Sequence, residues 1–102
     1  MESPEFTEHQ INAALKEQSP LDISVRWDGN YPEEEAAFDV YLCGENTNYF
    51  IWDRDYDLDV VESISANVYS VIDGSRSHER VANIIIALIE EDIAAGKLGE
   101  NV

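Results

Sequence analysis

The sequence is poor in basic residues, in cysteine and in long apolar runs, and each shortage excludes a class of protein. Only 6 of the 102 residues are Lys or Arg against 22 Asp or Glu, which gives a formal charge of −16 at pH 7. A surface of that sign repels phosphate, so we expect no direct binding to DNA, RNA or an anionic membrane. Cys43 is the single cysteine, so the chain cannot form an internal disulfide, and its cysteine and histidines lack the spacing of a zinc site.

The chain also lacks the features of a membrane or exported protein. No apolar run approaches the ~20 residues of a membrane span, and the chain does not open with a signal peptide. These features predict a cytoplasmic protein. A hydrophobic fraction of 44% is that of a folded protein, and the length allows one domain. We place that domain at residues 1–102, with frayed ends at 1–5 and 97–102.

The first element predicted is a helix over residues 8–18. Thr7 and Gln10 have the spacing of a capping box, and apolar residues then recur at helical intervals. The pair Ser19-Pro20 ends the helix, because the residue before a proline avoids the helical region.

Three strands follow in the prediction. Residues 21–27 alternate apolar and polar side chains, residues 36–43 do the same, and residues 47–52 (TNYFIW) are aromatic and β-branched. The turn Gly44-Glu45-Asn46 joins the second strand to the third.

The second half of the chain is predicted to be helical. Asp57 or Asp59 caps a helix that ends at Asp73-Gly74. Its apolar face would hold Val61, Ile64, Val68, Val71 and Ile72. The stretch 67–72 (NVYSVI) also fits a strand, and this alternative stays open. Ser75 or Ser77 opens the last helix, and Gly96 closes it. The main face of that helix would hold Ala82, Ile85, Ile86, Ile89 and Ile93.

The predicted order is therefore α-β-β-β-α-α. We expect an α+β fold with a three-stranded antiparallel meander and a single layer of helices on one sheet face. In such a meander the loops at 28–35 and 53–59 leave the same edge of the sheet. Together they hold eight of the 22 acidic residues, opposed only by Arg54.

These two loops are the predicted partner-binding surface, because clustered like charges destabilise a fold unless a partner or salt neutralises them. The predicted binding residues are Asp28, Glu33, Glu34, Glu35, Asp53, Asp55, Asp57 and Asp59, with Tyr31 and Tyr56 as aromatic anchors. Two alternatives stay open: the acids serve solubility alone, or the protein comes from a salt-adapted organism.

No catalytic chemistry is predicted. The histidines have no catalytic context, and the chain has no phosphate-binding glycine loop and no nucleophile elbow. The segment 53–59 lacks the glycine and glutamate of a calcium-binding helix–loop–helix, although an irregular, weak cation site there stays open. We therefore expect a protein that is not an enzyme and that has no cofactor and no metal site.

Two segments of the second half suggest further contacts. Arg76 and Arg80 crowd the start of the last helix, and we expect them to pair with Asp73, Glu62 or the 53–59 loop. Residues 84–89 are apolar without interruption, which is more than one helix face can account for. Either the helix is covered on two sides, or Ile84 and Leu88 form a homodimer interface.

The element order, together with the acidic segments 28–35 and 53–59, resembles the small acidic phage-encoded inhibitors that imitate nucleic acid, such as anti-restriction and anti-CRISPR proteins. The resemblance implies a mechanism in which carboxylates replace phosphates in the basic groove of a nucleic-acid-binding protein, within the host cytoplasm. The alternative is an adaptor or chaperone-like dimer that binds a protein client through the apolar last helix.

Overall fold

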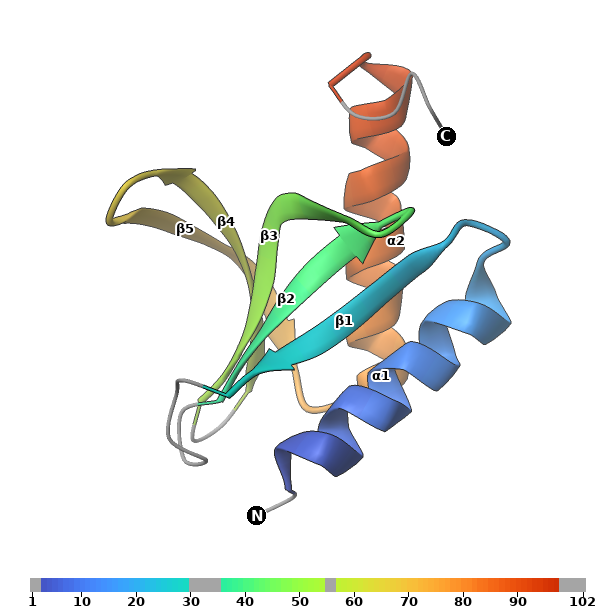
Figure 1. Cartoon of the computed structure of the whole chain (residues 1–102), viewed down its shortest axis with the longest axis vertical. Helices are drawn as coiled ribbons and strands as arrows, with labels where there is room; N and C mark the ends of the chain where they lie inside the picture. The colour runs from blue at the N-terminus through green and yellow to red at the C-terminus, as the bar shows by residue number, and fades with distance from the viewer. Residues whose placement is uncertain (1–2, 30–35, 55–56, 98–102) are drawn as a thin grey trace.

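The computed structural model describes residues 3–29, 36–54 and 57–97 as five strands and two helices around one core (Figure 1). In chain order these elements are α1 (Pro4–Gln18), β1 (Ile23–Asp28), β2 (Ala37–Leu42), β3 (Glu45–Asp53), β4 (Leu58–Ser65), β5 (Val68–Ser75) and α2 (His78–Ala94).

The five strands form one antiparallel sheet in the order β1-β2-β3-β4-β5. The predicted fold class, a three-stranded meander followed by two helices, is therefore wrong. The expected helix between Asp59 and Gly74 does not exist: its residues form the hairpin of β4 and β5, as the alternative for 67–72 had allowed for its second half.

The composition of this segment explains the hairpin. Valine and isoleucine dominate it, and β-branched side chains fit a pleated sheet better than a helix. Asn67 has φ +63°, a left-handed conformation that asparagine tolerates well, and it reverses the chain between the two strands. The apolar spacing imitated a helix face, yet only Val61 is buried, whereas Ile64 and Val71 are exposed.

The first helix begins earlier than predicted, whereas the last begins after one of its two predicted caps. The first helix begins at Pro4 and not at residue 8, because Ser3 caps it by accepting a hydrogen bond from the Phe6 amide and proline suits the first turn. Residues 4 and 5, expected to be frayed, are thus helical. The last helix has Ser77 as its cap, and its buried residues include Ala82, Ile85, Ile86 and Ile89, as predicted.

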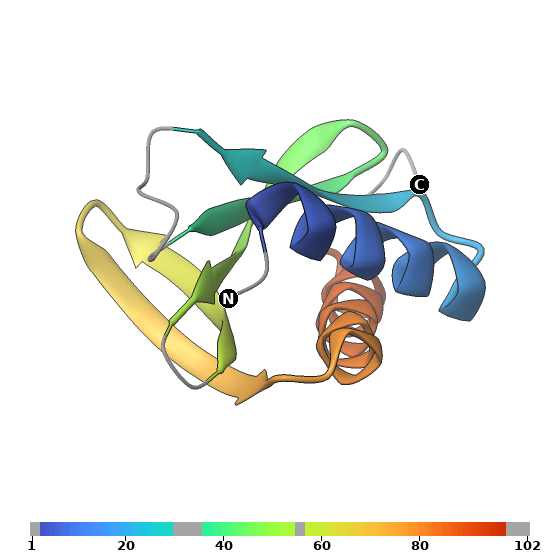
Figure 2. The ribbon, with the colours of Figure 1, turned by 90° about the horizontal axis from the view of Figure 1, so that it is seen from below.

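The two helices lie on one face of the sheet (Figure 2). The core between helices and sheet therefore contains the side chains from that one side of each strand. Phe38, Val40, Ile51 and Val60 point toward the helices and are fully buried. We call this the inner face. No helix of the described residues covers the opposite face, which we call the outer face.

The edge of the sheet at β1 is closed by side chains of α1. The Asn12 amide donates to the carbonyl of Val25 (3.0 Å) and accepts from its N–H (2.7 Å). The Glu8 carboxylate accepts from the Trp27 N–H (2.6 Å). These bonds use backbone groups that an edge strand otherwise offers to another chain.

We expect Asn12→Ala to destabilise the fold by about 1–2 kcal/mol, because it leaves a partly buried N–H and a carbonyl of Val25 without partners. Urea unfolding monitored by circular dichroism measures the change. Ala13→Ser, on the exposed side of the same helix, is the control and should change stability little. Equal stability of N12A and the parent chain would contradict the role given to this side chain.

Candidate functional site

The sheet register brings some of the predicted acidic residues to one end of the outer face. Asp28 pairs with Ala37, Ala37 with Trp52, and Trp52 with Asp59, so these four residues form one row across four strands. The starts of the two acidic segments are therefore at the same end of the sheet. Other predicted site residues lie outside the described residues, namely Tyr31, Glu33, Glu34, Glu35, Asp55 and Tyr56.

Asp53 does not belong to this surface. It is only 8% exposed, and its carboxylate accepts a hydrogen bond from Arg76 at 2.9 Å. The position follows from the alternation of β3, in which Tyr49, Ile51 and Asp53 point to the inner face. Asp53 therefore holds the loop after β5 against the end of β3, a structural role where we had predicted a partner contact.

Asp57 and Asp59 differ in exposure. Asp57 is exposed, whereas Asp59 is half-buried in β4. Burial raises the pKa of Asp59, Arg54 and Arg76 lower it, and Asp57 raises it further. Asp59 lies opposite Gly74, where the Cβ of any other residue would come within 2.6 Å of the Asp59 Oδ1, so glycine leaves room for the carboxylate.

A second row across the outer face joins charged and apolar side chains. Arg26 pairs with Asp39, Asp39 with Phe50, Phe50 with Val61, and Val61 with Val71. Directly opposite residues in a sheet have their Cβ atoms about 5 Å apart. The Asp39 carboxylate is therefore next to an aromatic ring, and Asp28 is its diagonal neighbour on β1.

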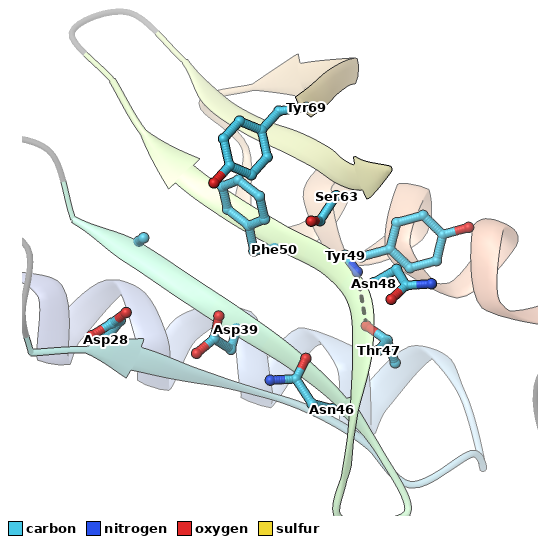
Figure 3. A pocket seen from close by; sticks show the side chains of 10 residues that line it. Asp28, Asp39, Asn46, Thr47, Asn48, Tyr49, Phe50, Ser63 and Tyr69 are labelled. Atoms are coloured by element: carbon cyan, nitrogen blue, oxygen red, sulfur yellow. Dashed lines mark hydrogen bonds between the residues drawn. The ribbon is translucent and has the colours of Figure 1, made fainter. Parts of the chain in front are cut away.

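A hollow of about 270 Å³ opens on the outer face around Asp39 and Phe50 of the second row (Figure 3). Asp28 and Asp39 line one side, together with the small side chain of Ala37, which lies opposite Asp28 in the register. Phe50 and Tyr69 line the other side, with their rings edge to face and their centroids 5.6 Å apart. The hollow thus combines two carboxylates with an aromatic wall, and we call it the outer-face pocket. Its remaining lining residues are Asn46, Thr47, Asn48, Tyr49 and Ser63.

The surroundings of Asp39 disfavour a negative charge on its carboxyl group. Burial raises the pKa of its carboxyl, the neighbouring Asp28 raises it further, and Arg26 lowers it. An additional cation in the pocket would oppose both effects that raise this pKa. The electrostatics of the pocket therefore favour a positively charged ligand.

All four arginines of the chain have contacts within the protein. Two stack on outer-face rings: the guanidinium of Arg26 lies 5.1 Å from the Tyr41 centroid, and that of Arg54 lies 4.4 Å from the Trp52 centroid. Such stacking is favourable because the ring face is electronegative.

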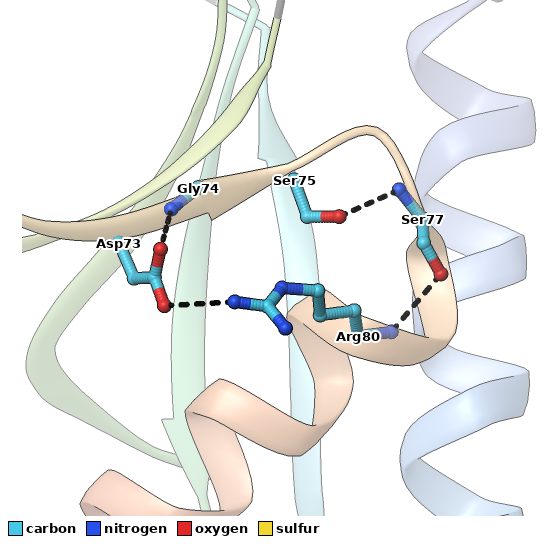
Figure 4. A network of polar contacts seen from close by, with 5 residues as sticks. All are labelled: Asp73, Gly74, Ser75, Ser77 and Arg80. Carbon is cyan, nitrogen blue, oxygen red and sulfur yellow. Dashed lines mark hydrogen bonds and ion pairs between the residues drawn. The ribbon is translucent and has the colours of Figure 1, made fainter.

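The other two arginines pair with acids near the start of α2, which confirms their predicted pairing within the chain. Arg76 binds Asp53. Arg80 binds Asp73 at 3.4 Å (Figure 4). Each of the four arginines thus has a contact within the chain. The two stacked arginines lie over Tyr41 and Trp52 and not over the Phe50–Tyr69 pair, which a cation of another molecule could contact.

Two other regions are weaker candidates. A larger hollow of about 800 Å³ runs along α1 and β1, but it is lined by His9 and Lys16 as well as Asp22, so its charge is mixed. The proposed dimer residues Ile84 and Leu88 are half-buried and pack against the core.

Sequence reasoning missed the two residues that define the pocket best. Asp39 was counted only as a polar position in a strand, although its place opposite Phe50 follows from the register. Tyr69 was assigned to a helix, so its meeting with Phe50 could not be foreseen. The signal for Tyr69 was the strand alternative at 67–72, which places this aromatic residue in a strand.

Among residues 3–29, 36–54 and 57–97, no group of three or more His, Cys, Asp or Glu side chains could hold a metal ion, and no helix is long and apolar enough to cross a membrane. No protein-family model, curated protein or solved structure matches the chain.

We expect Arg76→Gln to destabilise the protein by about 1–2 kcal/mol, because it leaves the buried carboxylate of Asp53 without this guanidinium. Arg80→Gln is the matched control: its ion pair is longer and both side chains are largely exposed, so its loss should cost less than about 0.5 kcal/mol. Chemical unfolding of both variants measures the difference, and equal losses would contradict the structural role of Asp53.

We expect Asp39→Asn to raise the melting temperature at pH 7. The pKa of Asp39 is higher in the folded protein than its ordinary value of 3.8, so ionised Asp39 opposes folding. This cost is absent below the unfolded-state pKa and is fully present above the folded-state pKa. The gain from D39N should therefore vanish at low pH, and a gain that does not change with pH would contradict the assignment.

Proposed function

We propose that this chain is a binding protein that places its outer sheet face against the basic surface of a nucleic-acid-binding protein and thereby keeps nucleic acid away from it. In this proposal the protein has no catalytic role. The carboxylates occupy positions where phosphates would otherwise lie, as in the acidic phage-encoded inhibitors that the sequence resembles.

The observation that carries the proposal is the outer-face pocket. Its carboxylates, Asp28 and Asp39, can accept hydrogen bonds from a guanidinium or an ammonium group. Its rings, Phe50 and Tyr69, can stack against the same group. An arginine side chain suits this combination best, because its planar head can contact a carboxylate at its edge and an aromatic ring at its face.

The surroundings of the pocket support a basic partner and not an acidic or neutral one. The net charge of −16 attracts a positive surface over distances beyond direct contact, which speeds association at low salt. Asp57 and Asp59 add negative charge at the same end of the sheet as Asp28, three strands away from it. The position of Ile84 and Leu88 against the core gives no comparable support to a client-binding last helix.

A nona-arginine peptide tests the pocket without a known target. We expect Asp28→Asn combined with Asp39→Asn to weaken peptide binding by about tenfold or more in calorimetric titration at low salt, because two charge-assisted contacts are lost. The matched control, Glu17→Gln combined with Glu90→Gln, removes the same charge from exposed positions on the two helices and should weaken binding far less. Similar losses in both double variants would show that net charge alone attracts the peptide.

The aromatic wall is tested by exchanging one ring. Tyr69→Phe keeps an aromatic face and should bind the peptide like the parent chain, whereas Tyr69→Leu should bind about threefold more weakly. Tyr69 is 52% exposed, so neither change should harm the fold. Binding should also weaken as the pH falls toward the raised pKa of Asp39, because protonation removes the charge that the cation contacts.

The inhibitory role is tested with proteins of a cell extract that bind DNA-cellulose. The parent chain, immobilised, should retain such a protein at low salt and release it when double-stranded DNA is added, whereas D28N/D39N should retain much less. Retention that DNA does not reverse would reject nucleic-acid mimicry and leave only a general affinity for basic proteins.

A further inference from the structure

The two edges of the sheet are treated differently. The edge at β1 is closed by Asn12 and Glu8 of α1, as described above. The other edge is β5, which follows β4 and has no strand beyond it in the part of the chain that the structure describes. An open edge strand offers a row of backbone donors and acceptors to another strand.

Apolar exposure is concentrated at this open edge. Among the described residues, five of the six large hydrophobic side chains that are exposed belong to the β4–β5 hairpin; they are Ile64, Val68, Tyr69, Val71 and Ile72. The hairpin also leans away from α2 and projects from the body of the molecule (Figure 1). Its outer strand is therefore accessible to another molecule without movement of the core.

The charge pattern favours one kind of partner for the β5 edge. Residues 63–72 contain no charged side chain, although 27% of the whole chain is charged; Glu62 and Asp73 flank this stretch. A basic partner would gain nothing from an uncharged edge. A second copy of the chain carries the same large negative charge and is repelled elsewhere, so it can approach most closely where neither surface is charged.

We propose that β5 pairs with β5 of a second copy, antiparallel and across a two-fold axis, to join the two sheets into one. An axis at Ser70 places Tyr69 opposite Val71 of the second copy, and by symmetry the same pair forms twice. Aromatic and β-branched residues form favourable cross-strand pairs. Ile72 has no register partner on β4, and this irregularity limits the pairing to a short segment.

The short segment and the mutual repulsion make the dimer weak, with a dissociation constant on the order of 10–100 µM. Repulsion between the copies is screened by salt, so dimerisation strengthens as salt rises. This dependence is opposite to that of binding a basic partner, which weakens with salt. The two proposals can therefore fail independently of each other.

Sedimentation velocity tests the dimer at protein concentrations from about 5 to about 500 µM, at about 50 and about 500 mM NaCl. We expect a shift from monomer to dimer with concentration and a larger dimer fraction at the higher salt. A monomer at every concentration and both salts would overturn the proposal, as would a dimer that weakens when salt is added.

Charged substitutions locate the interface. Val68→Glu combined with Val71→Glu places charges on the edge and should shift the dissociation constant at least about tenfold upward. Ala13→Glu combined with Ala87→Glu adds the same charge at exposed positions of α1 and α2 and should leave most of the dimer intact. An unchanged dimer in V68E/V71E, or equal losses in both double variants, would overturn the assignment to β5.

A second measurement does not depend on the variants being folded. Hydrogen exchange of the parent chain should show that β5 amides become more protected as protein concentration rises, while β1 amides do not change. Concentration-dependent protection confined to another element, such as α2, would place the interface there and reject β5 pairing.

Discussion

The outer face depends on one constraint: the two helices cover only one side of the sheet. Phe38, Val40, Ile51 and Val60 direct one face toward the two helices, so the residues between them in the sequence must point to the other side. The register then decides which outer-face residues meet. It places Asp39 of β2 beside Phe50 of β3 and brings Tyr69 of β5 to the same hollow. The pocket is a consequence of this packing and needs no irregular loop.

The few basic residues of the chain distribute the negative charge unevenly. Arg76 and Arg80 pair with acids beside the start of α2. Arg26 and Arg54 lie over rings of the outer face. An acidic protein with so few cations has an excess of carboxylates, and two of them, Asp28 and Asp39, lie together on the outer face. Burial and the neighbouring Asp28 raise the pKa of Asp39, so a charge at this position opposes folding.

The sequence predicted those parts of the fold in which one face of an element is wet and the other dry. Strands β1, β2 and β3 and helix α2 follow such alternations, so their positions were recognised within a few residues. The hairpin of β4 and β5 was not recognised, because it projects from the core and exposes Ile64, Val68 and Val71. Spacing that reflects burial predicts structure, whereas the spacing of exposed apolar residues does not. The turn at Asn67 was the local signal that separates the two interpretations.

The acidic residues at one end of the sheet were predicted, but the position of the pocket was not. Acidic residues at one end of the sheet were expected from the meander, and the register does bring Asp28 and Asp59 into one row. The alternation of β3, however, turns Asp53 inward to Arg76, and composition cannot reveal such a pairing. The missing hairpin also hid Tyr69, so the aromatic wall could not be inferred. A hairpin that leaves apolar residues of both its faces in solvent thus supplies both a ring for the pocket and an uncharged edge. Because the pocket lies on the face of the sheet and the edge lies in its plane, a cation in the pocket contacts side chains, whereas a strand at β5 is held by backbone groups, and Tyr69 is the side chain that both would contact.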